Sequence, residues 1–175
     1  MKEQRLWTVG HSTRPIPEFL SLLAGQGIRL VADVRAIPFS RRNPQFNQDV
    51  LSKSLEMAGI RYRHIGALGG RRKSQSDSKN LGWRNASFRG YADYMQTAGF
   101  QEALKDLEES AECVPTAIMC AEAVPWRCHR SLIADALIVR GWTVLEIVGA
   151  GEPKPHRLPP WAATEGGVVV YPGAG

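Results

Sequence analysis

The sequence predicts an α/β protein, a single-domain three-layer sandwich with helices on both faces of a mostly parallel sheet of about five strands. Three observations support this prediction. Short apolar runs rich in β-forming residues recur along the chain, segments with the apolar spacing of helices lie between them, and Gly, Pro or polar residues end most segments. Strands that alternate with helices form parallel sheets through right-handed crossovers.

The first elements form a strand–helix unit. Leu6–Val9 is rich in β-forming residues and is stopped by Gly10, which is typical of a buried strand. A helix opens at Pro15 and ends near Gly25, because Pro is favoured in the first helical turn and Gly just after the last. Leu30–Val34 is the second strand.

A polar loop with several arginines follows the second strand. Asn47 is expected to cap a helix that Gly59 ends, and Ile60–Ile65 is the third strand. The stretch Gly69–Ser87 is too polar for a core element, so we expect a long loop that is mobile without a ligand, with residues 71–85 as a candidate lid.

Helical spacing returns in Phe88–Met95 and Phe100–Ala111. Val114–Cys120 is the fourth strand, Arg130–Arg140 the next helix and Thr143–Val148 the fifth strand.

The length of 175 residues suits one domain, taken as residues 1–150, with a Pro- and Gly-rich tail over residues 151–175. In this tail, Val168–Tyr171 is a short edge strand or a loose segment. No apolar run approaches the roughly 18 residues of a membrane span, and residues 1–5 lack the features of a signal peptide. We therefore expect no membrane partner and a cytoplasmic location. Three cysteines without an export signal argue against a disulfide framework.

The formal net charge of +5 is unevenly distributed. Residues 35–89 contain nine Arg and three Lys against three acidic residues, so this third of the chain is strongly basic and the rest is mildly acidic. A basic region of this kind indicates an anionic partner, although a solubilising surface has the same composition.

Charged and reactive residue types follow four of the expected strands. In a parallel sheet ligands bind outside the carboxyl ends of the strands, so these residues are expected to form one site. They are His11 and Ser12, then Asp33 and Arg35, then Arg71, and finally Cys120, Glu122, Arg127, Cys128, His129 and Arg130.

The two cysteines of the last group allow three interpretations. Cys128 at a helix N-terminus beside Arg and His is expected to have a lowered pKa, with Cys120 as its redox partner or as the nucleophile itself. Alternatively, Cys120, Cys128 and His129 bind zinc or iron, with Glu122 as ligand or base. Finally, Cys120 is a small buried hydrophobic residue and His129 a hydrogen-bonded polar group, and we expect the same structural role for Cys113, which lies before the fourth strand.

His11 is a candidate acid or base, or binds an anion together with Ser12, for which a capping role is the alternative. Asp33, at the end of a buried strand, needs a cation such as Arg35 or Arg130 and is expected to be its structural partner. The remaining arginines are of the phosphate-binding kind, with aromatic residues near enough in sequence to stack on a base, although solvated charge and core aromatics explain them equally well. They are Arg41, Arg42, Arg71, Arg84 and Arg127, with Phe39, Phe46 and Trp83.

At these residues the sequence resembles the DUF488 family of bacterial and archaeal proteins of unknown function. The resemblance implies an α/β fold and one family pattern for the grouped segments, but no reaction; its members often carry a provisional label linked to DNA repair. The matching segments are Thr8–Arg14, Asp33–Arg35 with Pro38, Ser40–Phe46, Leu68–Arg71, Trp83–Asn85, Phe88–Tyr91, Met119–Glu122 and Trp126–Arg130.

Two functions are compatible with the sequence. One is an enzyme that acts on a phosphate-bearing ligand, a nucleotide or nucleic acid, in which arginines hold the anion, His11 and Glu122 move protons, and Cys120 or Cys128 is nucleophile, redox centre or metal ligand. The other is a non-catalytic nucleic-acid binding module that grips the backbone with the basic region 35–89.

Overall fold

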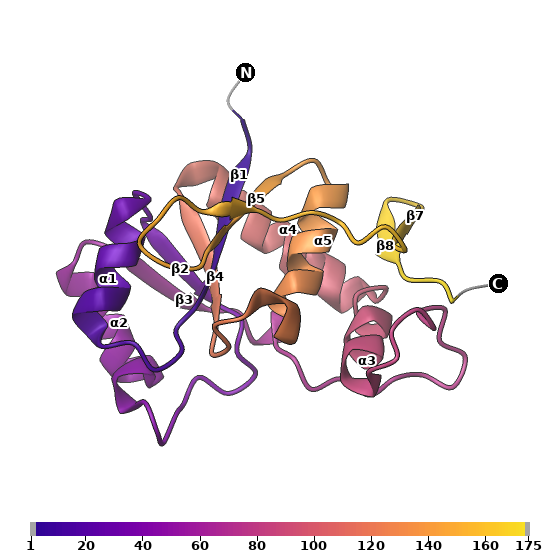
Figure 1. Cartoon of the computed structure of the whole chain (residues 1–175), viewed down its shortest axis with the longest axis horizontal. Helices are drawn as coiled ribbons and strands as arrows, with labels where there is room; N and C mark the ends of the chain where they lie inside the picture. The colour runs from indigo at the N-terminus through magenta and orange to yellow at the C-terminus, as the bar shows by residue number, and fades with distance from the viewer. Residues whose placement is uncertain (1–2, 174–175) are drawn as a thin grey trace.

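The computed structural model describes residues 3–173 and has the predicted α/β architecture, with a mostly parallel sheet between two helical layers (Figure 1). Six strands form the main sheet in the order β3-β2-β4-β1-β5-β6. The five parallel strands are β1 (Arg5–Gly10), β2 (Leu30–Asp33), β3 (Arg61–His64), β4 (Thr116–Cys120) and β5 (Thr143–Ile147). The short β6 (Lys154–Pro155) pairs with β5 in the antiparallel direction.

One face of the sheet is covered by α1 (Ile16–Gly25) and α2 (Gln48–Met57), and the other by α4 (Ala98–Cys113) and α5 (Arg130–Val139) (Figure 1). The short α3 (Ala86–Tyr94) lies beside the sheet and packs into the same core as α4 and α5 (Figure 1).

Alternation along the strands divides the core in two. Trp7 and Met119 pack with the α1–α2 layer, whereas Leu6, Ile118 and Cys120 pack with the α4–α5 layer, because successive side chains of a strand point to opposite faces. This alternation directs the side chain of Cys120 toward α5.

Residues 151–173 are folded onto the domain. Besides β6, they form a two-stranded sheet of β7 (Ala163–Glu165) and β8 (Val168–Val170), so the expected edge strand exists but pairs within its own small sheet. Tyr171 is fully buried, and its hydroxyl donates to Asp135 of α5 at 2.5 Å. His156 bridges the Asp135 and Glu146 carboxylates with its two ring nitrogens, at 2.6 and 2.8 Å. These contacts tie the segment to α5 and β5.

The polar loop over residues 71–85 has hydrogen bonds to α3 in its middle part. The buried Asp93 of α3 accepts hydrogen bonds from the backbone N–H of Gln75, the hydroxyl of Ser78 and the amide of Asn80. Three hydrogen bonds to one carboxylate hold the middle of this loop against α3.

Two further expectations need correction. Asn47 does precede α2, but its side chain accepts from the backbone N–H of Ser40 at 2.7 Å instead of capping the helix. Cys113, expected to be an ordinary structural thiol, is exposed at the end of α4. No helix in the described part of the chain is long and apolar enough to cross a membrane.

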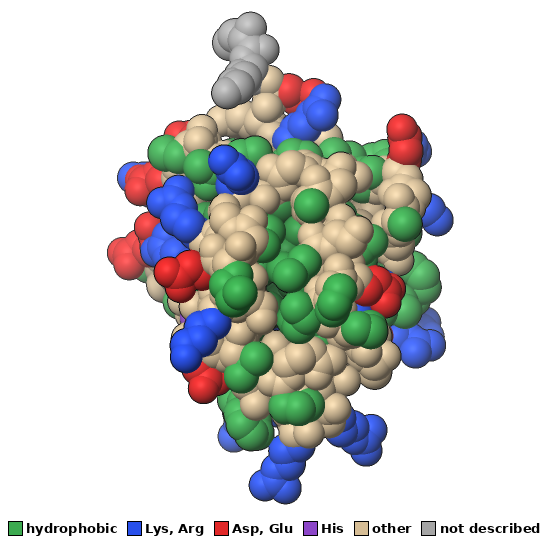
Figure 2. All heavy atoms as spheres, turned by 90° about the vertical axis from the view of Figure 1, so that its left-hand side faces the viewer, with side chains coloured by type: hydrophobic (Ala, Val, Ile, Leu, Met, Phe, Trp, Pro, Cys, Tyr) green, Lys and Arg blue, Asp and Glu red, His purple; other side chains and the backbone are tan. Residues whose placement is uncertain are grey.

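The basic region does not form an unbroken surface on the side of the molecule near α1 and α2. Figure 2 shows Lys and Arg side chains at both edges and at the lower end of this face, interleaved with acidic side chains and separated by hydrophobic ones. Several arginines of the region have partners within the protein. Arg35 pairs with Asp33, Arg63 with Asp106, Arg72 with the Tyr94 ring, and Arg89 with the Trp83 and Arg84 carbonyls.

Candidate functional site

A cavity of about 670 Å³ opens at the carboxyl ends of the strands, where the sequence predicts the site. Nine of the predicted site residues line it: His11, Arg35, Arg41, Arg71, Cys120, Glu122, Arg127, Cys128 and His129. The other predicted members do not line it: Ser12, Asp33, Arg42, Arg84 and Arg130. Asp33 and Arg130 are instead buried in the protein, where they hold residues that do line the cavity.

Close backbone packing brings the β1 and β4 ends together. The backbone N–H of His11 donates to the Cys120 carbonyl at 2.9 Å. A Cβ atom on Gly10 would lie 1.8 Å from the Glu122 carbonyl oxygen, so only glycine permits this approach.

Arg130 lies directly behind the cavity, with none of its surface exposed. Its Nη1 donates to Cys120 Sγ at 2.7 Å and also to the Glu122 carbonyl, and its Nη2 donates to the Ala123 carbonyl at 3.2 Å. Among residues 3–173, no carboxylate forms an ion pair with Arg130. A buried cation without a neighbouring negative charge is energetically costly. The thiolate form of Cys120, whose Sγ accepts from Arg130 Nη1, supplies that negative charge.

The two thiols of the cavity differ in acidity, in the reverse of the expected order. Burial raises the pKa of Cys120. The effects of Cys128 and of the Arg130 charge lower this pKa by more than burial raises it, so the net shift is downward. The hydrogen bond to Cys120, together with burial, raises the pKa of Cys128. The thiolate therefore resides on Cys120, while Cys128 stays protonated.

His129 stands beside Cys128 with a defined tautomer. Its Nε2 lies 2.8 Å from the Val34 carbonyl oxygen, which only accepts, so Nε2 carries the proton. Its Nδ1 then presents a lone pair 3.6 Å from Cys128 Sγ. Burial lowers the pKa of His129, so the neutral ring is the stable form.

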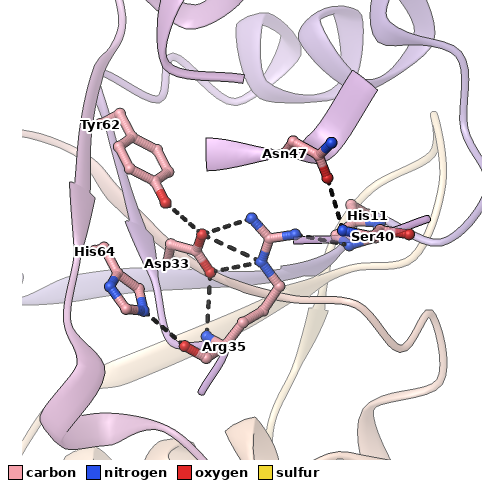
Figure 3. Close-up of polar contacts among 7 residues, drawn as sticks. All are labelled: His11, Asp33, Arg35, Ser40, Asn47, Tyr62 and His64. Carbon is pink, nitrogen blue, oxygen red and sulfur yellow. Dashed lines mark hydrogen bonds and ion pairs between the residues drawn. The ribbon is translucent and has the colours of Figure 1, made fainter. Parts of the chain in front are cut away.

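Asp33 and Arg35 form a buried ion pair on the β2 side of the cavity (Figure 3). Arg35 Nη2 donates to one Asp33 oxygen at 2.7 Å, and Arg35 Nε donates to the other at 2.9 Å. The hydroxyl of Tyr62 adds a donor to Asp33 at 2.5 Å, and His64 donates to the Arg35 carbonyl at 2.7 Å. Asp33 is thus the structural partner of Arg35 rather than of Arg130.

His11 is held in this cluster rather than free to move (Figure 3). Its Nδ1 donates to the Ser12 carbonyl at 2.8 Å, which leaves the Nε2 lone pair to accept from Arg35 Nη1 at 3.4 Å. The ring stacks on Phe46 with centroids 4.2 Å apart. Burial, with a smaller effect of the Arg35 charge, lowers the pKa of His11, so the ring is neutral.

The outer part of the cavity is cationic and partly apolar. Arg41, Arg71 and Arg127 are exposed and line it, as does Phe39, whose exposed fraction is 59%. Phe39 alone of the three candidate stacking residues is free for a ligand, because Phe46 is buried on His11 and Trp83 packs among other aromatic rings.

The geometry gives the metal interpretation little support. From Glu3 to Gly173, no group of three or more His, Cys, Asp or Glu side chains is arranged to hold a metal ion. Of the expected ligands, His129 has one nitrogen on the Val34 carbonyl and the other beside Cys128, while Cys120 faces Arg130.

Sequence reasoning missed two supporting residues, Tyr62 and Asn47. Tyr62 becomes a partner of Asp33 only because β3 pairs with β2, and Asn47 braces the loop that carries Arg41 by accepting from Ser40. The sequence does indicate that a buried Asp33 needs several hydrogen-bond donors. Which residues supply them depends on which strands pair, and the sequence does not show that.

A family model described as "Domain of unknown function DUF488" matches residues 15–137, a span that includes Asp33, Arg35 and the whole Cys120–Arg130 segment. No curated protein and no solved structure matches the chain.

Proposed function

The chain belongs to the DUF488 family, whose description assigns no activity, and we propose that it is an enzyme that uses the Cys120 thiolate on a phosphate-bearing ligand, a nucleotide or nucleic acid. One observation carries this proposal: the fully buried Arg130 donates to Cys120 Sγ at 2.7 Å in a place where no carboxylate of the described chain neutralises it. A cation fixed behind a thiol stabilises the nucleophilic, ionised form at neutral pH.

The cationic residues around the opening support the ligand class. Arg41, Arg71 and Arg127 present guanidinium groups to the cavity, and a planar fork of donors suits phosphate oxygens. Phe39 offers an exposed ring on which a base can stack. The volume of about 670 Å³ is in the usual range for a small-molecule site.

The other predicted residues take more specific roles in this proposal. Glu122 is exposed at the cavity and is the candidate proton carrier there. His129 is the base beside Cys128. His11 acts as a positioning residue, because its nitrogens are engaged with the Ser12 carbonyl and with Arg35.

Alkylation with iodoacetamide tests the thiolate. In a Cys113→Ser background, which removes the exposed third thiol, Cys120 should alkylate at neutral pH about tenfold or more faster than Cys128, as measured by peptide mass spectrometry. Arg130→Lys keeps a charge but removes the planar fork and should slow Cys120. Equal rates for Cys120 and Cys128 would remove the basis of the proposal.

Protection from alkylation tests the ligand class. AMP and inorganic pyrophosphate should slow the alkylation of Cys120, and Arg41→Ala should weaken this protection. Arg42→Ala is the matched control, because Arg42 is the next residue but does not line the cavity. If neither anion protects Cys120, the ligand is not phosphate-bearing.

A nucleic-acid binding module remains the alternative, and it predicts a different result. It requires affinity for DNA or RNA that falls steeply with salt and that does not change when Cys120 is replaced by Ser. The internal partners of Arg35, Arg63, Arg72 and Arg89 reduce the charge available for such binding.

A further inference from the structure

We infer that Cys120 and Cys128 form a two-thiol redox pair, in which a hydroperoxide oxidises Cys120 and Cys128 then resolves the product to a disulfide. This inference rests on the proposed function for the assignment of the thiolate to Cys120. It adds the class of a second substrate, a hydroperoxide, and a reacting role for Cys128.

The positions of the two sulfurs support the pairing. Both cysteines line the same cavity, and both are free thiols. Both side chains are buried, Cys120 with 2% and Cys128 with 7% of its surface exposed. Arg130 contacts both, through Nη1 to Cys120 Sγ at 2.7 Å and through its backbone N–H to Cys128 Sγ at 3.5 Å. The structure thus places both thiols on the same arginine, at a cavity that is open to small molecules.

His129 completes the pair with a base for the second thiol. Its Nδ1 lone pair lies 3.6 Å from Cys128 Sγ, and the Val34 carbonyl fixes the ring by accepting from Nε2–H. A protonated resolving thiol must lose its proton as it attacks, and neutral imidazole is a suitable acceptor. This use accounts for a half-buried histidine whose two ring nitrogens both have neighbours that fix its orientation.

The first step is oxidation of Cys120. Its Sγ thiolate attacks the outer oxygen of the hydroperoxide, so an S–O bond forms and the O–O bond breaks. The departing alkoxide or hydroxide takes a proton from solvent and leaves as alcohol or water. Cys120 is now a sulfenic acid, oxidised by two electrons, and the hydroperoxide is reduced by two.

The second step is resolution by Cys128. Its Sγ attacks the Cys120 sulfur, so an S–S bond forms and the S–O bond breaks. The Cys128 proton passes to His129 Nδ1 and from there to the departing hydroxide, which leaves as water. The overall change is one hydroperoxide and two thiols to one alcohol or water, one disulfide and one water. An external thiol returns the pair to its reduced form.

Intact-mass spectrometry after treatment with one equivalent of hydrogen peroxide tests the inference, in the Cys113→Ser background with dimedone present to trap sulfenic acid. The protein with both thiols should lose the mass of two hydrogen atoms, and peptide mapping should find Cys120 joined to Cys128. The Cys128→Ser variant should instead carry dimedone on Cys120. Serine is chosen because its hydroxyl replaces the sulfur at nearly the same size and cannot form a disulfide, and far-UV circular dichroism checks the fold of the variant.

Three outcomes are distinguishable. A disulfide in the parent and a trapped sulfenic acid in Cys128→Ser support the inference. If the parent also accumulates the dimedone adduct on Cys120 and forms no disulfide, Cys128 is not a resolving thiol, although the thiolate of the proposed function stands. The third outcome concerns hydrogen peroxide treatment of the protein without the Cys113→Ser change. If neither Cys120 nor Cys128 is oxidised faster than the exposed Cys113 in that protein, both the inference and the proposed function fail.

Discussion

Replacement of His156 by Gln should remove a pH-dependent part of the stability of the fold. His156 is 11% exposed at its side chain and faces Asp135 and Glu146, one through each ring nitrogen. Both partners are carboxylates, so both nitrogens carry protons and the ring is an imidazolium. Burial lowers the pKa of His156, but the hydrogen bonds to Asp135 and Glu146 outweigh it and raise the pKa to about 9 from the ordinary 6.5.

The magnitude follows from these two pKa values. A group whose pKa is raised on folding stabilises the protein fully below its unfolded pKa, and this stabilisation is lost as the pH rises through the folded pKa. With 6.5 unfolded and about 9 folded, the proton on His156 contributes on the order of 2–3 kcal/mol at pH 7 and less than about 1 kcal/mol at pH 9. The stability gap between the parent and His156→Gln should therefore narrow by about 2 kcal/mol between these two pH values.

Urea unfolding of the parent and of His156→Gln, monitored by tryptophan fluorescence between pH 7 and pH 9, measures the difference in the free energy of unfolding. Every other titrating group is shared, so its effect cancels in the difference, and equal slopes of free energy against urea ensure that the comparison is valid. A gap that stays constant with pH would mean that His156 is not protonated between Asp135 and Glu146, and the account of how residues 151–173 dock on α5 would be wrong.

Three shorter predictions concern the site. Gly10→Ala should destabilise the fold and make Cys120 react faster with alkylating reagents, because the alanine Cβ would lie 1.8 Å from the Glu122 carbonyl oxygen. An unchanged melting temperature would contradict this close approach of the two backbone segments. Asp33→Asn should cost about 3–5 kcal/mol in urea unfolding, since it leaves the Arg35 charge buried and unpaired, and a loss below about 1 kcal/mol would show that the pair contributes little. Asp93→Ala should make residues 71–85 sensitive to limited proteolysis while the core stays folded, because it removes three anchoring hydrogen bonds; unchanged cleavage would mean that other contacts hold the loop.

Much of the fold was predictable because it depends on local pattern. The strands and helices follow from apolar periodicity and from Pro and Gly at their ends, and the carboxyl-end rule then places Cys120, Cys128 and His129 beside one another. The docking of the C-terminal segment was not predictable, because it depends on polar contacts of His156 and Tyr171 with Asp135, which is distant in sequence.

The acidity of the two thiols shows why sequence neighbours mislead. Cys128 was expected to carry the lowered pKa because Arg127 and His129 adjoin it. In the fold Arg127 is exposed at the cavity, whereas the guanidinium of Arg130 reaches Cys120 from the first turn of α5. Electrostatic effects depend on distance and burial, and neither follows from position in the chain.

The sequence by itself determined the order of the strands and helices, the end of the sheet at which reactive residues gather, and which residue types gather there, because these depend on short-range periodicity and on the direction of parallel strands. The tertiary structure decided which arginines face the cavity, which thiol is ionised, and how Tyr62 and His11 hold the Asp33–Arg35 pair. These features depend on contacts between segments far apart in the chain, where a difference of a few ångströms separates a hydrogen bond from no interaction.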